Sequence, residues 1–406
     1  MPTRTLAATL PLLASLLLAA CGGGGTSNDV AAPAPAPAPA ATPAVAPSPA
    51  PAAEDAPPWT VAATNSTSRA IAVLASGERA AAWSDAGGTI WSQRFDAQGK
   101  RVGNPLAIGT GTAVAGIAAL PAGGAVVEFG TASAVYVQVV SAAGALVGSP
   151  ATVRTQPQVE SDLAGNIGPK LLGGAGVFAL ADGGFAASYV RYHDAHIPGD
   201  TPTDLMAQKF DATGAATGTP VFLASSRDTS TLAIAPTAGH GVAVADMYLC
   251  PCAISGSTSG DVFDGSLQST HANLSNGGAR PGDIEMDQSV AALAGGNVFV
   301  KWTVTTAAPA THSQVNEVQG EIFGSASTGI LTFPNAAPDA QATALAAGGF
   351  VLTWGSSAQA FDATGHAVTG VMPVLQGSVA ATPDGGFIVL AQVGDRLVAQ
   401  PYALGP

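Results

Sequence analysis

The chain has few charged residues, few cysteines and no long hydrophobic run after Cys21. These shortages exclude certain partners and a second membrane span. Charged residues make up 10% of the 406 residues, and 14 basic against 27 acidic side chains give a net charge of −13. Nucleic acids and anionic lipid headgroups repel such a surface, so we expect no nucleic-acid partner. No stretch after Cys21 is long and apolar enough for a second membrane span. Glycine, in contrast, is abundant at 50 residues, which fits short strands joined by tight turns.

The first 20 residues, 1–20, are predicted to be an export signal. Arg4 supplies a positive start, and Leu6–Ala20 is an apolar stretch too short to cross a bilayer. The segment Leu18–Cys21 resembles the lipobox of bacterial lipoproteins, in which the cysteine is acylated and becomes the mature N-terminus. The resemblance implies a lipid anchor on Cys21, and an ordinary secretory signal that contains a cysteine is the alternative. Gly22 stands where an aspartate would retain such lipoproteins in the inner membrane, which favours the outer membrane.

Residues 21–58 are predicted to form a tether. This segment consists mainly of glycine, alanine, proline and serine, with strict Ala-Pro alternation over residues 32–39. Proline fixes φ and lacks a backbone donor, so we expect a disordered, polyproline-II-like linker that rises about 3.1 Å per residue. Such a linker holds the remaining domain, residues 59–406, clear of the membrane surface.

One phrase recurs through residues 59–406. It consists of Gly-Gly-Phe, a short apolar run that ends at an aromatic residue, a variable gap, and Gln-x-Phe-Asp-Ala-x-Gly. The clearest copies run from Leu180 to Gly214 and from Leu345 to Gly365. Alignment on the glycine turn gives seven units, which begin near Leu74, Leu120, Leu180, Ile234, Leu293, Leu345 and Ala381. Their spacing of roughly 37 to 60 residues is that of a four-stranded propeller blade.

We therefore predict an all-β fold, namely a seven-bladed β-propeller. The last unit has three strands before the chain stops at Pro406, and Trp59–Ala63 is a lone strand-like run ahead of the first unit. Pairing of these two segments would complete the seventh blade and close the ring, so that no sheet edge stays exposed.

The phrase resembles the tandem β repeats of large secreted bacterial proteins, some of which also carry calcium-binding glycine-rich nonapeptides. The resemblance covers most of Leu74–Tyr402; it is good in units one, three and six, partial in two, five and seven, and poor in four. It implies structural modules that bring no catalytic residues. The calcium-binding nonapeptide is absent from this sequence, so no cofactor is predicted.

Two side-chain positions recur in register within the units. The second strand carries an aromatic residue at one position: Trp83, Phe129, Tyr189, Trp302 and Trp354. Packing of one blade against the next explains these rings better than a row of ligand-stacking aromatics. A glutamine recurs near the end of the third strand: Gln93, Gln138, Gln208, Gln359 and Gln400. We expect these amides to form hydrogen bonds with the neighbouring backbone.

The longest insertions fall on one face of the predicted propeller. Strands alternate in direction, so the glycine turn and the Phe-Asp turn lie on one face, and the other connections lie on the opposite face. Five stretches on that opposite face are predicted to be long loops: 156–176, 192–204, 249–264, 276–288 and 306–317. Functional residues favour loops on a rigid scaffold, although drift in tolerant loops explains the lengths equally well.

Histidines and acids in this sector are the first candidate site. His193 and His196 lie three residues apart, with Asp200 and Asp204 downstream, and this set is able to ligate a transition metal. The same spacing is common in solvated polar loops, which is the simpler interpretation.

The fourth unit supplies the other candidates. Cys250 and Cys252 are the only thiols after Cys21, so a disulfide between them is expected in an oxidising compartment, with a redox role or a free pair as alternatives. Asp246 occupies the position where other units carry an aromatic residue, and with Asp204 and His240 it makes up the candidate pocket. Decay of an irregular unit explains Asp246 as well.

Two functions follow from these features. The first is a binding or scaffold module, anchored in the cell envelope by lipidated Cys21, whose loops meet an envelope protein or an extracellular polysaccharide. The second is an envelope hydrolase or lyase with a site on the long-loop face of repeats three to five. The sequence contains no Gly-x-Ser-x-Gly elbow, no phosphate-binding loop and no zinc-protease helix, which favours the non-enzymatic function. A catalytic site with a serine nucleophile, assembled from residues of distant blades, is still compatible with the sequence.

Overall fold

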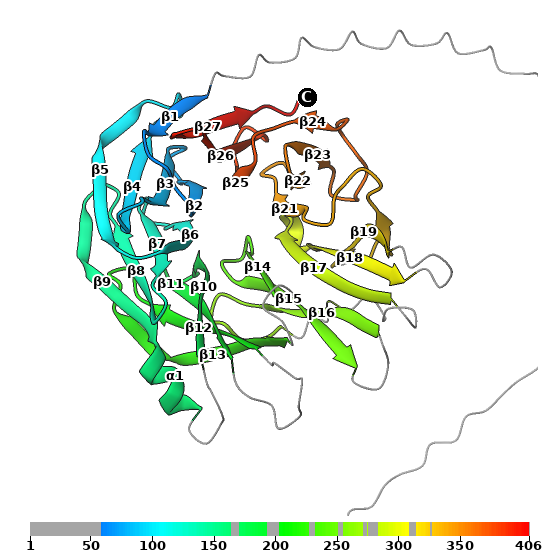
Figure 1. The fold of residues 1–406 in the computed structure, drawn as a ribbon, viewed down its shortest axis with the longest axis horizontal. Coiled ribbons are helices and arrows are strands. Elements are labelled where there is room, and N and C mark those ends of the chain that lie inside the picture. The colour runs from blue at the N-terminus through cyan, green and yellow to red at the C-terminus, as the bar shows by residue number, and fades with distance from the viewer. Residues whose placement is uncertain are drawn as a thin grey trace, which may run out of the picture. The chain divides into compact units, whose positions relative to one another are not determined.

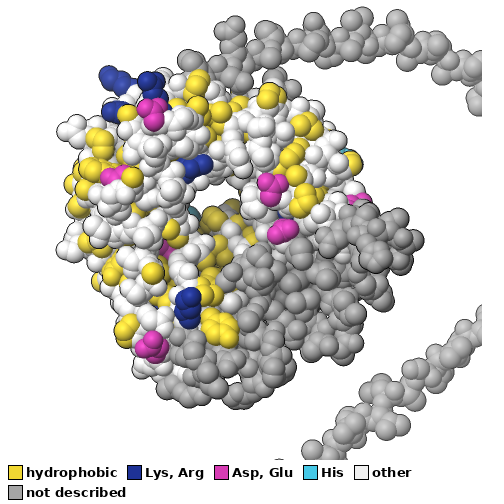
Figure 2. All heavy atoms as spheres, viewed as in Figure 1, with side chains coloured by type: hydrophobic (Ala, Val, Ile, Leu, Met, Phe, Trp, Pro, Cys, Tyr) yellow, Lys and Arg dark blue, Asp and Glu magenta, His cyan; other side chains and the backbone are white. Residues whose placement is uncertain are grey.

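The computed structural model describes residues 58–163, 170–192, 203–226, 232–250, 255–270, 274, 283–307, 314–324 and 327–405. These residues belong to one compact unit that spans residues 50–406. Its strands form blades that follow one another around a central opening (Figures 1 and 2), and the prediction of a seven-bladed β-propeller is confirmed. Five of the predicted site residues lie outside the described residues: Cys21, His193, His196, Asp200 and Cys252.

Blades 1 to 3 are four-stranded antiparallel sheets in which sequence order is also spatial order. Their strands are β2 (Arg69–Val73), β3 (Arg79–Ser84), β4 (Thr89–Phe95) and β5 (Arg101–Thr110); β6 (Ala113–Ala119), β7 (Ala125–Gly130), β8 (Ala134–Val140) and β9 (Leu146–Thr155); and β10 (Lys170–Ala179), β11 (Phe185–Tyr192), β12 (Thr203–Phe210) and β13 (Ala216–Ser226). The helix α1 (Gln156–Asp162) follows β9 in the link between blades 2 and 3.

Blades 4 to 6 follow a similar plan, but blade 4 has three strands among the described residues and is joined to blade 5. Their strands are β14 (Ala233–Pro236), β15 (Val242–Cys250) and β16 (Ser255–Phe263); β17 (Asp283–Ala292), β18 (Val298–Ala307), β19 (Gln314–Phe323) and β20 (Leu331–Thr332); and β21 (Gln341–Ala344), β22 (Phe350–Trp354), β23 (Ser357–Phe361) and β24 (Met372–Pro373). A single parallel pair, Gly256 opposite Ile284, joins β16 to β17, so that blades 4 and 5 share one seven-stranded sheet. The turn η2 (Ala294–Gly296) connects β17 to β18.

The seventh blade combines the two ends of the described chain. It contains β25 (Gly377–Ala381), β26 (Phe387–Val393) and β27 (Arg396–Tyr402), and its outer strand is β1 (Trp59–Ala62). Strand β1 pairs antiparallel with β27, with Trp59 opposite Ala399 and Thr60 opposite Val398. The first and last blades, blue and red in Figure 1, are therefore neighbours, and β2 of blade 1 contacts β25 of blade 7.

Two faces of the ring follow from the alternation of strand direction. We call turn face the side that carries the tight turns between first and second strands, such as Leu180–Gly184. There the Leu180 N–H donates to the Gly184 carbonyl over 2.9 Å, and Gly183 adopts φ 87°, a conformation that favours glycine. We call loop face the opposite side, where second strands join third strands and one blade joins the next.

The recurrent glutamines form hydrogen bonds with the neighbouring backbone, as predicted, and in blades 1 to 3 they lie at a bulge of the outer strand. In blade 3 the Gln208 amide donates to the carbonyls of Lys209 (2.9 Å) and Thr217 (3.0 Å). The pairing of β12 with β13 shifts register at this point, next to Gly218, whose φ is 68°. Gln93 and Gln138 make equivalent bonds to Val102 and Val147, both over 3.0 Å. A proline two residues after each bulge glycine costs no ladder bond, because the strand is unpaired there.

The core lies between the blades rather than within them. Each pair of neighbouring blades shares a buried apolar layer, and blade 7 shares one with blade 1 that includes Val61, Trp83 and Leu397. The aromatic residues of the second strands fill these layers: Trp83, Phe129, Tyr189 and Trp302 are buried and Trp354 is half-buried. The interpretation of these rings as blade packing is confirmed, and full burial of each contributes about 1.5–3 kcal/mol.

Two of the predicted long loops contain long parts of strands. Residues 249–264 and 306–317 were expected to be irregular, whereas β15 pairs with β16 as far as Cys250 opposite Ser255, and β18 with β19 as far as Ala307 opposite Gln314. The low apolar content of Ser255–Gly260 hides the strand, but uninterrupted pairing with β15 supplies the backbone hydrogen bonds. Stretch 156–176 is also partly regular, since it includes α1 and the first half of β10.

Charged side chains are sparse on the face shown in Figure 2, where hydrophobic and uncharged polar groups dominate. Of the helices in the described ranges, none has the length and apolar character needed to cross a membrane.

Candidate functional site: a pocket with aliphatic side chains on the loop face

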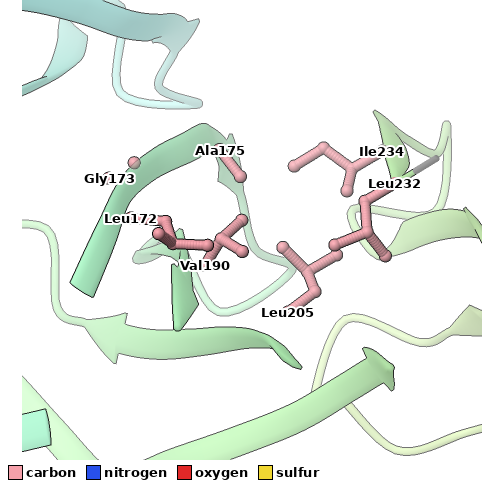
Figure 3. A pocket seen from close by; sticks show the side chains of 8 residues that line it. Leu172, Gly173, Ala175, Val190, Leu205, Leu232 and Ile234 are labelled. Atoms are coloured by element: carbon pink, nitrogen blue, oxygen red, sulfur yellow. The ribbon is translucent and has the colours of Figure 1, made fainter. Parts of the chain in front are cut away.

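A cavity of about 440 Å³ opens between blades 3 and 4 (Figure 3). Its lining residues are Leu172, Gly173, Gly174 and Ala175 of β10, Val190 of β11, Leu205 of β12, and Leu232 and Ile234 of blade 4. Leu172, Val190 and Leu205 each lie two residues from the loop-face end of their strand, so the cavity belongs to the loop face. Figure 3 shows the side chain of Leu205 from β12 lying next to those of Leu232, which directly precedes β14, and Ile234 of β14.

Strand alternation explains why aliphatic groups face this cavity. In β11, Tyr189 packs in the apolar layer shared with blade 2, and its neighbour Val190 packs in the layer shared with blade 4. In β12, Met206 packs in the layer shared with blade 2, and Leu205 packs in the layer shared with blade 4. The cavity is therefore the loop-face end of the layer between blades 3 and 4, where that layer is incompletely filled.

Glycines of β10 shape one wall of the cavity. Strand β10 shifts register against β11 between Leu171 and Gly173 and again between Gly174 and Gly176. Gly173 adopts φ 136° and faces open space, whereas a Cβ on Gly174 would lie 2.2 Å from Glu128 Oε1. The first glycine keeps the cavity open, and the second lets blade 2 approach the backbone of blade 3.

The lining of this cavity combines aliphatic side chains with peptide groups. None of its eight lining residues carries an ionisable side chain, and its polar groups are peptide N–H and C=O groups. The volume lies within the 300–1,000 Å³ range of small-molecule sites. Such a cavity accepts an apolar group of a ligand or partner, but it offers no acid, base or nucleophile.

Asp204, a predicted pocket residue, directly precedes Leu205 in β12. Its side chain is therefore on the side of blade 3 that faces away from this cavity. Its carboxylate is 3.1 Å from the Arg191 guanidinium, and the other end of that guanidinium is 3.8 Å from Asp162 of α1. Arg154 also forms an ion pair with Asp162. Asp204 thus belongs to a charge network, Arg154–Asp162–Arg191–Asp204, that ties α1 to blades 2 and 3. Burial raises the pKa of Tyr189, which packs next to this network.

His240 lies on the turn face, away from Asp204. It occupies the left-handed position of the turn Thr237–Gly241, with φ 59°, where the other turns of this type carry glycine. Its side chain is exposed and lines a separate cavity of about 450 Å³, together with Leu74, Leu120 and Pro383 of other blades. The turn face and the loop face are at opposite ends of the strands, so His240 and Asp204 do not share a pocket.

Asp246 lies within β15, where it is half-buried opposite Ser259 of β16. The Ser259 hydroxyl donates a hydrogen bond to its carboxylate, and burial raises the pKa of Asp246. It is not among the lining residues of the cavity between blades 3 and 4. Cys250 ends the same strand. Within the described ranges, no three His, Cys, Asp or Glu side chains are grouped so that they could hold a metal ion.

Sequence reasoning missed Glu128 and Lys301, which are both fully buried. Each directly precedes the recurrent aromatic residue of its second strand. A charged residue at that position of an apolar strand is visible in the sequence and could have drawn attention to both. The Gly176 N–H donates to Glu128 over 3.1 Å, and burial raises the pKa of Glu128 well above its ordinary value. Lys301 donates to the Asp287 carbonyl over 2.8 Å, and burial lowers its pKa to about 8. Both side chains form hydrogen bonds with irregular inner strands, and neither is among the lining residues of the cavity between blades 3 and 4, although Glu128 lies behind Gly174 of its wall.

Comparisons with known proteins agree with the fold and add no function. No protein-family model matches the chain, and no curated protein matches its sequence. The α-L-arabinanase of Penicillium chrysogenum is 11% identical, with a TM-score of 0.48 over 87% of this chain and 99% of that chain. The β-propeller domain of Cps50 (Swd1) from Myceliophteria thermophila is 11% identical, with a TM-score of 0.46 over 86% and 100%. The fucose-specific lectin from Aleuria aurantia is 11% identical, with a TM-score of 0.39 over 76% and 95%.

Proposed function

We propose that this β-propeller is a binding module of the cell envelope that captures a protein partner on its loop face. The observation that carries the proposal is the cavity between blades 3 and 4, whose side chains are all aliphatic. An apolar side chain of a partner would be desolvated there at about 25 cal/mol per Å² of buried apolar surface. A polysaccharide would find only peptide N–H and C=O groups for its hydroxyl groups and no polar side chain, whereas an apolar side chain of a protein would contact the aliphatic groups, so we favour a protein.

The rim of the cavity supports the same function. Leu172 is 40% exposed at its edge, an apolar group that a partner can cover. The charge network of Asp204 and Arg191 stiffens the other side of the same blade, so the cavity is pre-formed and little ordering is needed on binding. The enzymatic alternative has less support, because His240, Asp204 and Asp246 are not gathered around one cavity.

The proposal extends to the location of the protein, which we infer from its N-terminal segments. A lipid on Cys21 would hold the chain at a membrane, with the outer membrane favoured by Gly22. Residues 21–58 would then set the reach of the loop face from the membrane surface.

Replacing Leu172 with glutamate should abolish capture of the partner. The full-length chain is immobilised and incubated with detergent extracts of envelopes from cells that produce it, and retained proteins are identified by mass spectrometry. A charge at the rim must be desolvated on binding, so the specific retained protein should fall at least tenfold. Leu146→Glu is the matched control, since Leu146 is 43% exposed on β9 and lies outside the cavity. Equal retention by both variants, or no specifically retained protein with the unaltered chain, would overturn the proposal.

A further inference from the structure

A second recess lies at the seam between the first and last blades, far along the ring from the pocket of blades 3 and 4. Its volume is about 210 Å³, and its lining residues are Ala62, Thr64, Trp83, Asp85, Trp91 and Pro105. Ala62 ends β1 of blade 7, and the aromatic residues belong to β3 and β4 of blade 1. Asp85 starts the connection between β3 and β4, so this recess also opens on the loop face.

Two indole rings form the aromatic part of the recess. Trp83 and Trp91 are directly opposite each other across β3 and β4, so their side chains leave the sheet on the same side. Trp83 is only 3% exposed and packs in the layer between blades 7 and 1, whereas Trp91 is half-buried. Trp83 therefore supports the floor, and Trp91 is the ring that a ligand can touch.

The Asp85 carboxylate is fixed beside this ring. Its Oδ2 accepts a hydrogen bond from Trp91 Nε1 over 2.8 Å, and its Oδ1 accepts bonds from the backbone N–H groups of Gly87 and Thr89, both over 2.9 Å. The bond from Trp91, followed by that from Thr89, holds the pKa of Asp85 below its ordinary value. A carboxylate oxygen has two acceptor positions, so Oδ2 keeps one for a ligand.

We propose that this recess binds a single uncharged pyranose ring. The apolar C–H face of the sugar would stack on the Trp91 indole, and a hydroxyl group at the edge of the sugar would donate to Asp85 Oδ2. The volume is below the 300–1,000 Å³ typical of larger ligands, which limits the site to one ring. A negatively charged sugar is disfavoured by Asp85 and by the acidic balance of the chain.

A cationic ammonium group is the competing ligand class, and the geometry favours the sugar. Cation-binding cages surround the charge with several accessible aromatic faces. Here Trp83 is covered, so that one accessible ring remains, and three hydrogen bonds already share the charge of Asp85. The remaining walls, Ala62, Thr64 and Pro105, match the mixed apolar and hydroxyl surface of a sugar.

The test is saturation-transfer NMR on the full-length chain with methyl glycosides of glucose, galactose, mannose, fucose and N-acetylglucosamine as probes. At least one of them should receive saturation from the unaltered protein, and glucuronate and choline should not. Trp91→Ala and Asp85→Asn should each weaken that binding about tenfold or more, since a hydrogen bond to a charged group is worth about 1.5–3 kcal/mol. The asparagine side chain retains an oxygen that can accept the backbone hydrogen bonds of the turn, so Asp85→Asn should fold. This variant therefore tests the proposal even if Trp91→Ala does not fold.

Two controls separate this site from the rest of the molecule. Asp362→Asn alters an aspartate that accepts the same kind of backbone bonds, from Thr364 and His366, but has no tryptophan partner, and it should leave sugar binding unchanged. Leu172→Glu should also leave it unchanged, so failure here is distinct from failure of the proposed protein-binding function. Binding of choline alone, no saturation of any glycoside, or sugar binding that survives Asp85→Asn would overturn the proposal.

Discussion

Replacing Val61 with aspartate should lower the free energy of unfolding by about 3–5 kcal/mol, the cost of burying an unpaired charge. Val61 is 1% exposed in β1, where it packs in the layer between blades 7 and 1. The ionised side chain would find apolar neighbours such as Leu397 and Ala399, and β1 would detach from β27. Urea unfolding followed by tryptophan fluorescence measures the loss as a lower midpoint.

The matched control for this prediction is Ala63→Asp. Ala63 directly follows β1 and is exposed, so a charge there stays in water and should change stability by less than about 0.5 kcal/mol. If Val61→Asp were as stable as Ala63→Asp, the strand at Trp59–Ala62 would not be a necessary part of the seventh blade.

Replacing Glu128 with glutamine should raise the free energy of unfolding at pH 7–8, where burial of the carboxyl group otherwise destabilises the folded state. Burial raises the folded-state pKa of Glu128 well above its ordinary value. Between the unfolded pKa, about 4.3, and the raised folded pKa, the unfolded state releases a proton that the folded state keeps. Stability is therefore highest below the unfolded pKa and falls by up to about 1.4 kcal/mol per pH unit as the pH rises. The amide removes this loss and can still accept the Gly176 N–H bond.

Thermal or urea unfolding of both proteins from pH 4 to pH 8 checks this prediction. The two stability curves should converge near pH 4 and separate as the pH rises. Glu160→Gln is the control, because Glu160 is exposed on α1 and its substitution should leave the curve of the unaltered protein unchanged. Parallel curves for Glu128→Gln and the unaltered protein would mean that Glu128 is ionised in the folded state.

The fold was predictable because its main determinants recur along the sequence. The glycine of most tight turns adopts a positive φ, as at Gly183, and the glutamine at a bulge, such as Gln208, forms hydrogen bonds with carbonyls that the ladder leaves free. A requirement that recurs in most blades is visible in a single sequence. The strand at Trp59 was found by the same logic, because the last unit lacked an outer strand.

Features that occur once were not predictable in this way. The strands within 249–264 follow from pairing with β15 and leave no alternation of apolar residues in Ser255–Gly260. The cavity between blades 3 and 4 depends on which side of each strand meets the next blade. Its residues, such as Leu172 and Leu205, look like ordinary core residues in the sequence. From the sequence, we favoured ionisable groups and so selected Asp204. Side chains alternate along β12, so Asp204 pairs with Arg191 on the side away from the cavity that Leu205 lines.

Site-directed photo-crosslinking in intact cells tests the central claim, that the loop face between blades 3 and 4 binds a protein partner, most directly. Leu172 or Leu146 is replaced in turn by p-benzoylphenylalanine in the full-length chain, and crosslinked products are resolved by mass after irradiation. We predict a discrete adduct with one protein from position 172 and none from position 146, since the two leucines are similarly exposed but Leu172 alone lines the cavity. No adduct from position 172, or the same adducts from both positions, would contradict the account.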